Sequence, residues 1–241
     1  MPRTVPMSWP DLYITHPFTC PYYGDREARN IIPDPSAPMT AGLYDELIRH
    51  GFRRSGEHAY LPHCPNCSDC ISLRVESRRF RPSRSDRRLL RAHEDTRVHI
   101  TPPSADAETF ALYRDYLAAR HPGGGMDEPE ADDFPGFLVS SWSRTEFVRF
   151  ERDDRLLAVA VIDRVADGLS AVYTFFDPTA EKMAPGRLAI LWMIEEAKRC
   201  DLPFVYLGYW IPGHPKMDYK HRFRPAQIHR HGLGWMELGE D

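Results

Sequence analysis

The order of the apolar segments in the second half of the chain restricts its fold more than any other feature of the sequence. Three strand-like runs come first and are separated by short acidic turns, a helical run follows, and one more strand-like run completes the series. Consecutive hairpins before a single crossover helix predict a mixed sheet with helices on its faces. The five runs are residues 146–151, 156–163, 169–176, about 186–200, and 204–209.

A smaller α+β unit that contains most of the cysteines is expected before this sheet. The best boundary is Thr101-Pro102-Pro103-Ser104, because two prolines interrupt regular structure and a serine can cap a following helix. We therefore expect an α+β protein of two domains, residues 1–101 and residues 102–241. Residues 121–133, which are rich in glycine and acids, are expected to form a mobile loop.

The composition is that of a globular protein, with 42% apolar and 27% charged residues. The longest purely apolar run, Leu156 to Ile162, is far shorter than the roughly 20 residues of a membrane-spanning helix. The first residues lack the basic start and the apolar stretch of a secretory signal. We therefore expect a cytoplasmic protein with no membrane partner, in which the cysteines are free thiols or metal ligands.

Three cysteines lie close together in the run Cys64-Pro-Asn-Cys67-Ser-Asp-Cys70. Thiolates at this spacing can converge on one soft metal ion, and four ligands suit Zn²⁺ or an iron–sulfur cluster. Cys20 is the candidate fourth ligand, and His63 competes with it. Two alternatives stay open, namely a redox pair of Cys64 and Cys67 and thiols without a function.

The chain contains two strongly basic stretches although its net charge is −4. Residues 78–91 contain seven arginines and one acid, and residues 214–231 contain five lysines or arginines, one acid and four histidines. Concentrated positive charge on an otherwise acidic chain is typical of a protein that binds a polyanion such as nucleic acid. The alternative is a pair of solvated faces whose charges pair with the acidic remainder.

Several ordered blocks of the sequence resemble the aminoacyl-tRNA–protein transferases. In the first half they are Cys20-Pro21-Tyr22, GFRRSGEHAYLPHCPNCSDC (51–70) and RFRPSRSDRR (79–88). In the second half they are AVYTFFDP (171–178), YLGYWI (206–211) and KMDYKHRFRP (216–225). Together these blocks extend over roughly residues 16 to 230.

The resemblance implies an enzyme that takes an amino acid from a charged tRNA and adds it to the α-amino group of a protein. The chain lacks the long insertions of the eukaryotic arginyltransferases. This implies leucyl-tRNA as donor and, as acceptors, proteins with N-terminal Asp or Glu, which are thereby marked for degradation. The resemblance also implies a GNAT-like fold for the second domain, and it implies that Cys20, Cys64, Cys67 and Cys70 match positions at which some relatives hold a metal or a cluster.

Three alternatives to this function stay open. They are arginyl-tRNA as the donor, a GNAT acetyltransferase that uses acetyl-CoA, and a non-catalytic RNA-binding module. Ordinary GNAT acetyltransferases bind coenzyme A at a glycine-rich turn, whereas the stretch from Lys182 to Arg187 holds a single glycine. That departure argues against acetyl-CoA.

Aminoacyl transfer of this kind requires no cofactor for the chemistry itself. The amino acid is already activated as an ester, and about a tenth to a fifth of an α-amine with a pKa near 7.7–8.0 is neutral at pH 7. Positioning the amine against the ester carbonyl can therefore supply most of the acceleration. The absence of an obvious nucleophile–base pair from the sequence agrees with this.

Candidate site residues follow from the resemblance and from the charge pattern. Tyr173 and Asp177 are the catalytic candidates, because they lie on or just after the strand that faces the reaction centre in GNAT-like sheets. Asp177 is alternatively a turn residue before Pro178. An acidic acceptor side chain needs a cation, for which the candidates are Lys216, Lys220, Arg222 and Arg224, with Arg78 and Arg79 as rivals. The tRNA needs phosphate contacts and stacking rings, for which the candidates are Arg78, Arg79, Arg81, Arg84, Arg87, Arg88, Tyr209, Trp210 and Tyr219.

Overall fold

The computed structural model of the chain describes residues 9–120 and 133–239. The mobile loop expected at residues 121–133 lies, except for residue 133, outside the described residues. Within the described ranges, no helix is both long and apolar enough to cross a membrane.

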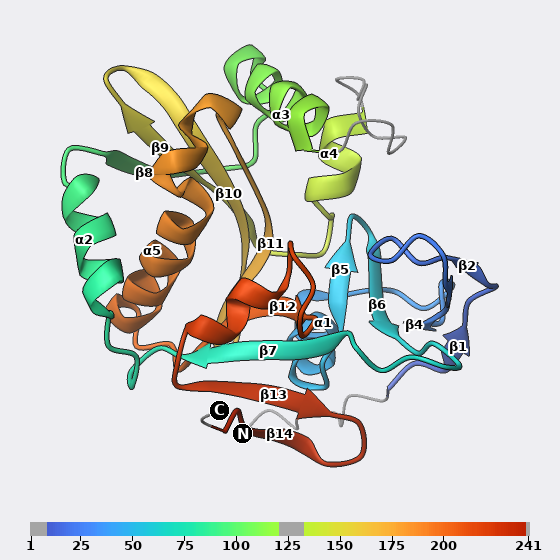
Figure 1. Cartoon of the computed structure of the whole chain (residues 1–241). Helices are drawn as coiled ribbons and strands as arrows, with labels where there is room; N and C mark the ends of the chain where they lie inside the picture. Colours follow the sequence, from blue (N-terminus) through green and yellow to red (C-terminus); the bar gives the residue numbers. More distant parts are fainter. Residues whose placement is uncertain (1–8, 121–132, 240–241) are drawn as a thin grey trace, which may run out of the picture.

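An eight-stranded sheet runs through the centre of the molecule (Figure 1). Its neighbouring strands are antiparallel except for β11 and β12, which are parallel. The α+β class and the mixed sheet expected from the sequence are thereby confirmed. In spatial order the strands are β14 (Gly234–Glu237), β13 (Ala226–Arg230), β7 (Ile71–Glu76), β12 (Phe204–Trp210), β11 (Gly168–Phe176), β10 (Arg155–Val165), β9 (Thr145–Arg152) and β8 (Arg97–Thr101).

Helices cover both faces of this sheet. Alternate residues of β10 point to opposite faces, so that Ala158 and Ala160 belong to one apolar core and Val159 and Val161 to another. The first core lies under α5 (Pro185–Arg199), the crossover helix from β11 to β12, and the second lies under α3 (Ala107–Arg120) and α4 (Asp133–Leu138). Residues 156–163 of β10 are consequently all buried, and residues 156–162 are all apolar.

A basic helix, α2 (Arg84–Ala92), lies against α5 (Figure 1). Its first turn is fixed by a capping box, in which the Ser83 hydroxyl accepts from the Asp86 amide and the Asp86 carboxylate accepts from the Ser83 amide. Leu89 and Leu90 pack against the first core. The arginines of the helix are thereby left on its outer side.

A second, four-stranded sheet lies beside the large one and holds α1 (Ala41–Arg49) (Figure 1). Thr40 caps α1, because its hydroxyl accepts from the Leu43 amide. The strand order is β1 (Leu12–Ile14), β4 (Asn30–Pro33), β6 (His58–Pro62) and β5 (Arg53–Ser55), and a short pair is formed by β2 (Phe18–Thr19) and β3 (Glu27–Ala28).

The large sheet crosses the boundary expected between residues 1–101 and 102–241. Strands β7 and β8 come from the first range, and β7 is a central strand that pairs with both β12 and β13. Its residues Leu73 and Val75 are fully buried. The prolines at 102 and 103 therefore follow an edge strand of the sheet and do not divide one sheet from the other.

The parallel pair β11 and β12 separates soon after it begins. Pairing extends only over Gly168–Phe204, Leu169–Val205 and Ser170–Tyr206. At the start of the pair the two backbones approach so closely that a Cβ on Gly168 would lie 2.4 Å from the Phe204 carbonyl oxygen. Beyond Ser170 the two strands diverge, and we call the space between their later residues the strand gap.

Replacing Gly168 with alanine should destabilise the protein, because its methyl group would meet a backbone oxygen that cannot move without separating β11 from β12. We expect the free energy of unfolding to fall by about 1–3 kcal/mol in urea denaturation. Gly42→Ala in α1 is the matched control, since a Cβ there would have nothing within 4 Å. Equal stabilities of the two variants would contradict the close approach.

Candidate functional site

The strand gap leaves part of a central strand open. Ala171, Val172, Tyr173 and Thr174 of β11 are all only half-buried, although strands or helices surround β11 on every side. Their side chains alternate between the two faces, so both faces of the strand are partly accessible here. Backbone groups of β11 and β12 that face the gap need partners other than each other.

Arg53 of β5 supplies one of those partners. Its guanidinium donates to the Ala171 carbonyl of β11 and, at 3.2 Å, to the Ser170 hydroxyl. The side chain passes directly over Gly208 of β12, where a Cβ would lie 2.9 Å from Arg53 Cζ. Gly208 also has a φ of +75°, so a glycine is required there both for its backbone conformation and for the passage of the arginine.

Lys220 makes the corresponding contact on the other strand. It comes from the short helix η2 (Asp218–Arg222), and its Nζ donates to the Tyr209 carbonyl of β12 at 2.7 Å. Only 9% of the residue is exposed. Burial, together with the positive charge of Arg53, lowers the pKa of the Lys220 ammonium from 10.5 to about 7.

Buried tyrosines connect these two cations with the cysteine segment. The Tyr209 hydroxyl donates to the Tyr60 carbonyl at 3.1 Å, and the two rings lie 5.9 Å apart. Burial raises the pKa of Tyr22, Tyr60 and Tyr209, so all three hydroxyls are neutral at physiological pH. Burial likewise raises the pKa of the Cys70 thiol to about 12.

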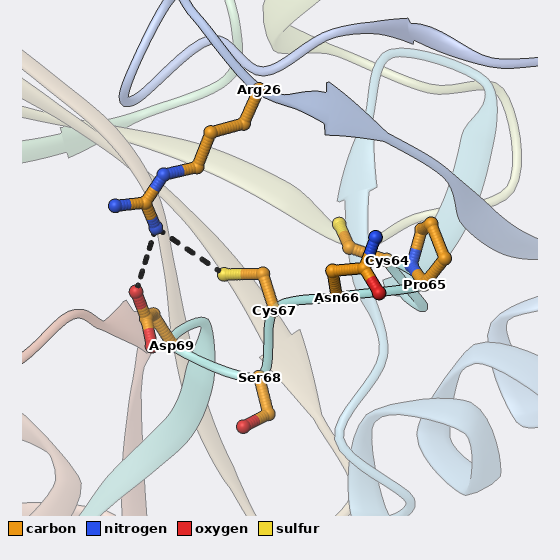
Figure 2. A pocket seen from close by; sticks show the side chains of 7 residues that line it. All are labelled: Arg26, Cys64, Pro65, Asn66, Cys67, Ser68 and Asp69. Carbon is orange, nitrogen blue, oxygen red and sulfur yellow. Dashed lines mark hydrogen bonds and ion pairs between the residues drawn. The ribbon is translucent and has the colours of Figure 1, made fainter.

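The cysteine segment itself lines an open cavity of about 410 Å³ (Figure 2). Arg26 reaches across it and donates to Asp69 at 3.3 Å and to the Cys67 sulfur at 3.8 Å. Asp69 also accepts from the Tyr23 hydroxyl at 2.9 Å, which lowers the pKa of its carboxyl. The lining residues are Arg26, Cys64, Pro65, Asn66, Cys67, Ser68 and Asp69.

The four candidate thiols lie near one another without forming a metal site in this arrangement. The charges of Cys20, Cys64 and Cys67 all raise the pKa of Cys70, which shows that the four are neighbours. However, in the described part of the chain no three His, Cys, Asp or Glu side chains converge as a bound metal requires. Four thiols are a donor set that suits Zn²⁺ or an iron–sulfur cluster, and Cys20, Cys64, Cys67 and Cys70 would be the residues to hold it. We assign no step of the reaction to a metal.

The two catalytic candidates have different surroundings. Tyr173 lies among the rings of Tyr113, Tyr116 and Phe137, and its buried hydroxyl has no hydrogen-bond partner among the described residues. Asp177, in contrast, caps the short helix η1 (Pro178–Met183), because one carboxylate oxygen accepts from the amide and the hydroxyl of Thr179. This is the turn role that the sequence left open for it.

The predicted tRNA-binding arginines divide into two sets. Arg78 pairs with Asp201 at 2.6 Å, Arg79 pairs with Glu76 and Glu237, and Arg81 donates to backbone carbonyls. The α2 arginines are all exposed, and none has a carboxylate partner in the part of the chain that the structure describes. These arginines without an acidic partner are Arg84, Arg87, Arg88 and Arg91.

Helix α2 also contacts the two elements that follow β11 in the chain. Its first turn contacts the start of α5, where Arg187 donates to Asp86 at 2.6 Å. Its last turn contacts η1, because a ring nitrogen of His93 lies 2.8 Å from the Met183 carbonyl oxygen. Since η1 and α5 directly follow β11, the basic helix borders the end of β11 at which the two strands have separated.

The remaining predicted residues of the tail are not equivalent to Lys220. Arg224 donates to the carbonyls of His221, Leu238 and Gly239, and it therefore fastens the C-terminal segment. Lys216 and Arg222 are exposed, and Lys216 Nζ donates to the Arg120 carbonyl at 3.2 Å. Of the three predicted stacking rings, Tyr209 is buried, the Trp210 indole is fixed by Asp218 at 2.9 Å, and Tyr219 is exposed.

Sequence reasoning missed Arg53 and Tyr60. Both lie inside the block 51–70, but attention to the cysteines left the preceding arginine pair unassigned. The available signal was the adjacent pair Arg53-Arg54 on a short predicted hairpin. Adjacent residues of a strand point to opposite faces, so at least one of the two arginines must face the rest of the protein. Arg54 forms a fully buried ion pair with Asp163, and Arg53 enters the strand gap.

Lys220→Met should stabilise the protein below neutral pH. A lysine whose folded pKa is about 7 and whose unfolded pKa is near 10.5 is charged in both states below pH 7, so its burial cost is then fully present. The cost disappears as the pH rises from 7 to 10.5. We expect the free energy of unfolding to rise by about 1–4 kcal/mol at pH 6, with a smaller gain at pH 9.5, in urea titrations. A variant that is less stable than the parent at both pH values would show that the ammonium supports the fold.

Comparison with known proteins agrees with the resemblance seen in the sequence blocks. The aspartate/glutamate leucyltransferase of Nitrosococcus oceani is 45% identical over 221 residues, which cover 91% of this chain and 93% of the relative. The enzyme of the same name from Stenotrophomonas maltophilia is 44% identical over 236 residues, or 95% and 94% of the two chains. Among solved structures, the C-terminal domain of a putative lysylphosphatidylglycerol synthetase from Agrobacterium fabrum has a TM-score of 0.47 at 11% identity, covering 71% of this chain and 52% of that one.

Two family models match the chain in succession. The model described as Arginine-tRNA-protein transferase, N terminus, matches residues 18–88, and the model described as Arginine-tRNA-protein transferase, C terminus, matches residues 108–230. The strand gap, the cysteine segment and most of α2 all lie inside these matched ranges. The chain therefore belongs to the arginine-tRNA-protein transferase family.

Proposed function

We propose that this protein transfers leucine from leucyl-tRNA to the α-amino group of cytoplasmic proteins that begin with Asp or Glu, and thereby marks them for degradation. The observation that carries the proposal is identity of about 45%, over nine-tenths of the chain, to relatives named aspartate/glutamate leucyltransferase. The structure adds support through a partly open central strand that is bordered on one side by buried cations and on another by a basic helix.

The reaction is an exchange of an ester for an amide. The neutral α-amine of the acceptor attacks the ester carbonyl carbon, a C–N bond forms, and the bond from that carbon to the ribose oxygen breaks. One proton of the amine passes to the ribose oxygen, so that charge is conserved. Positioning of the two reactants in the strand gap, beside half-buried Tyr173, is the contribution expected of the protein. The Tyr173 hydroxyl, which has no partner among the described residues, is available to donate to the developing oxyanion or to the ribose oxygen.

Helix α2 suits the acceptor stem of the tRNA. Its arginines Arg84, Arg87, Arg88 and Arg91 lack carboxylate partners among the described residues, so their charge is available to phosphates. Because α2 contacts the two elements that follow β11, a stem bound there would have its 3′ end near β11. Tyr219, which is exposed, is a candidate stacking ring for the terminal base.

The surroundings of α5 favour a tRNA donor over acetyl-CoA. Asp86 pairs with Arg187 in the first turn of α5, and the residue before that helix, Ala184, makes no side-chain cap. The helix start that holds the coenzyme A pyrophosphate in ordinary GNAT acetyltransferases is thus covered by α2 and its carboxylate. Arginyl-tRNA remains the competing donor, since the family models carry the arginine name.

Radiolabel transfer with purified protein tests the proposed function directly. We expect labelled leucine to appear on peptides that begin with Asp or Glu, and not on peptides that begin with Lys or Ala. Parallel reactions with arginyl-tRNA identify the donor. Transfer of arginine alone would overturn leucine as the donor, and transfer of neither amino acid would overturn the function.

Removing arginines of α2 should weaken tRNA binding specifically. For Arg84→Gln/Arg88→Gln we expect the affinity for leucyl-tRNA to fall about tenfold or more at low salt. The slope of log affinity against log salt should decrease by about 0.7–0.9 for each phosphate that the variant no longer binds. The comparison variant is Arg78→Gln/Arg79→Gln, which removes the same charge from residues already engaged with acids. An equal effect of both double variants would contradict the division of the arginines into two sets.

A further inference from the structure

We propose that Arg53 and Lys220 together bind the side-chain carboxylate of the acceptor's N-terminal Asp or Glu, and that they set the enzyme's preference for acidic termini. This inference rests on the proposed function and identifies the receptor for its acceptor. The sequence blocks identify Lys220 only as one of several basic residues of the C-terminal stretch. They do not identify Arg53, which the fold places near Lys220.

The pair consists of two buried basic groups, a charged arginine and a lysine that is charged in part of the molecules at neutral pH, and neither has an acidic partner among the described residues. Each residue is only 9% exposed, and neither has a carboxylate within ion-pair distance in the described part of the chain. The buried carboxylate of Asp163 is already bound by Arg54. Keeping two such charges below the surface is costly unless an anion joins them, and the cost is recovered when that anion is a ligand.

The neighbouring groups that could become negative do not fill this role. Burial raises the pKa of Tyr60 and Tyr209, so these hydroxyls are neutral at physiological pH. The cluster is therefore positive as it stands, and its charges also repel each other, because Arg53 disfavours the charged form of Lys220. A bound carboxylate would relieve both effects.

The position of the pair fits an acceptor side chain. Arg53 is fixed on the Ala171 carbonyl of β11 and Lys220 on the Tyr209 carbonyl of β12, so the two cations lie on opposite sides of the strand gap. In Asp the carboxylate carbon is three bonds from the reacting nitrogen, and in Glu it is four. The groups that bind this carboxylate must consequently lie close to the ester carbonyl carbon that the amine attacks. Arg53 and Lys220 meet this requirement when transfer takes place in the strand gap.

Enough donors remain on the pair to hold a carboxylate. Arg53 uses one N–H toward Ser170 and one toward Ala171 out of five, and Lys220 uses one of three toward Tyr209. A carboxylate has two oxygens and accepts from several donors, whereas an amide of the same shape presents an NH₂ group that the cations would repel. A tRNA phosphate is the competing anion, but the arginines on the outer side of α2 are better placed for the backbone of a large polyanion.

Steady-state transfer by Lys220→Met and Arg53→Lys tests the proposal. The acceptors are two peptides that differ only in their first residue, Asp or the uncharged isostere Asn. We expect KM for the Asp peptide to rise at least about tenfold in each variant, and the ratio of kcat/KM between the Asp and Asn peptides to fall by a similar factor. KM for leucyl-tRNA should not change. Lys198→Met is the matched control, because Lys198 pairs with Glu195 on the outer side of α5 and should leave all these constants unchanged.

The remaining outcomes overturn the inference in distinguishable ways. An unchanged ratio of kcat/KM between the Asp and Asn peptides, in a variant whose urea midpoint matches that of the parent, would show that the pair does not recognise the carboxylate. A parallel loss of activity toward both peptides, together with a lowered urea midpoint, would indicate structural damage. A rise in KM for leucyl-tRNA with the Asp peptide unaffected would assign the pair to a tRNA phosphate. If the parent protein itself transfers nothing to the Asp peptide, the proposed function fails before the variants are compared.

Discussion

The separation of β11 from β12 is the constraint on which the rest of the site depends. Two neighbouring parallel strands inside a sheet normally satisfy each other's backbone groups, and leaving buried carbonyls unpaired costs free energy. Here Arg53 and Lys220 take over carbonyls that the missing pairing would have used, one on each strand. The gap is thus maintained by two side chains that come from opposite ends of the sequence, which requires the small sheet and the C-terminal segment to pack against the large sheet together.

The second half of the fold could be predicted from the sequence because its signals are local. The short apolar runs of β9 to β11, the turns between them and the helical spacing of α5 each specify an element without reference to distant residues. The partners of β7 could not be predicted in this way. Its alternation of apolar and polar residues indicates a strand, but nothing in residues 71–76 specifies pairing with strands more than a hundred residues later. The helix α2 was missed for another reason, since its many arginines obscured the capping box of Ser83 and Asp86.

The candidate site was only partly accessible to sequence reasoning. Motif blocks identify which residue types matter, but they do not show which cations are engaged with acids. Arg78 and Arg79 look the same as Arg84 and Arg88 in the sequence, and only the fold brings Asp201 and Glu237 to the first two. Lys220 looks like a surface residue of a basic tail, and it is buried because η2 folds back over the end of β12.

Exposed and buried cations in this protein are suited to different anions. An exposed arginine without an acidic partner costs little to maintain, and it gives affinity that depends on salt and is indifferent to the shape of the anion, which suits a nucleic-acid backbone. A buried cation without a counter-charge is expensive, but the same low dielectric makes its attraction for one well-placed anion strong and selective. A transferase that must accept many proteins and reject most N-terminal residues needs the second kind of charge at the reacting end of its acceptor. The four arginines of α2 and the pair of Arg53 and Lys220 provide these two kinds of charge at neighbouring positions around one strand gap.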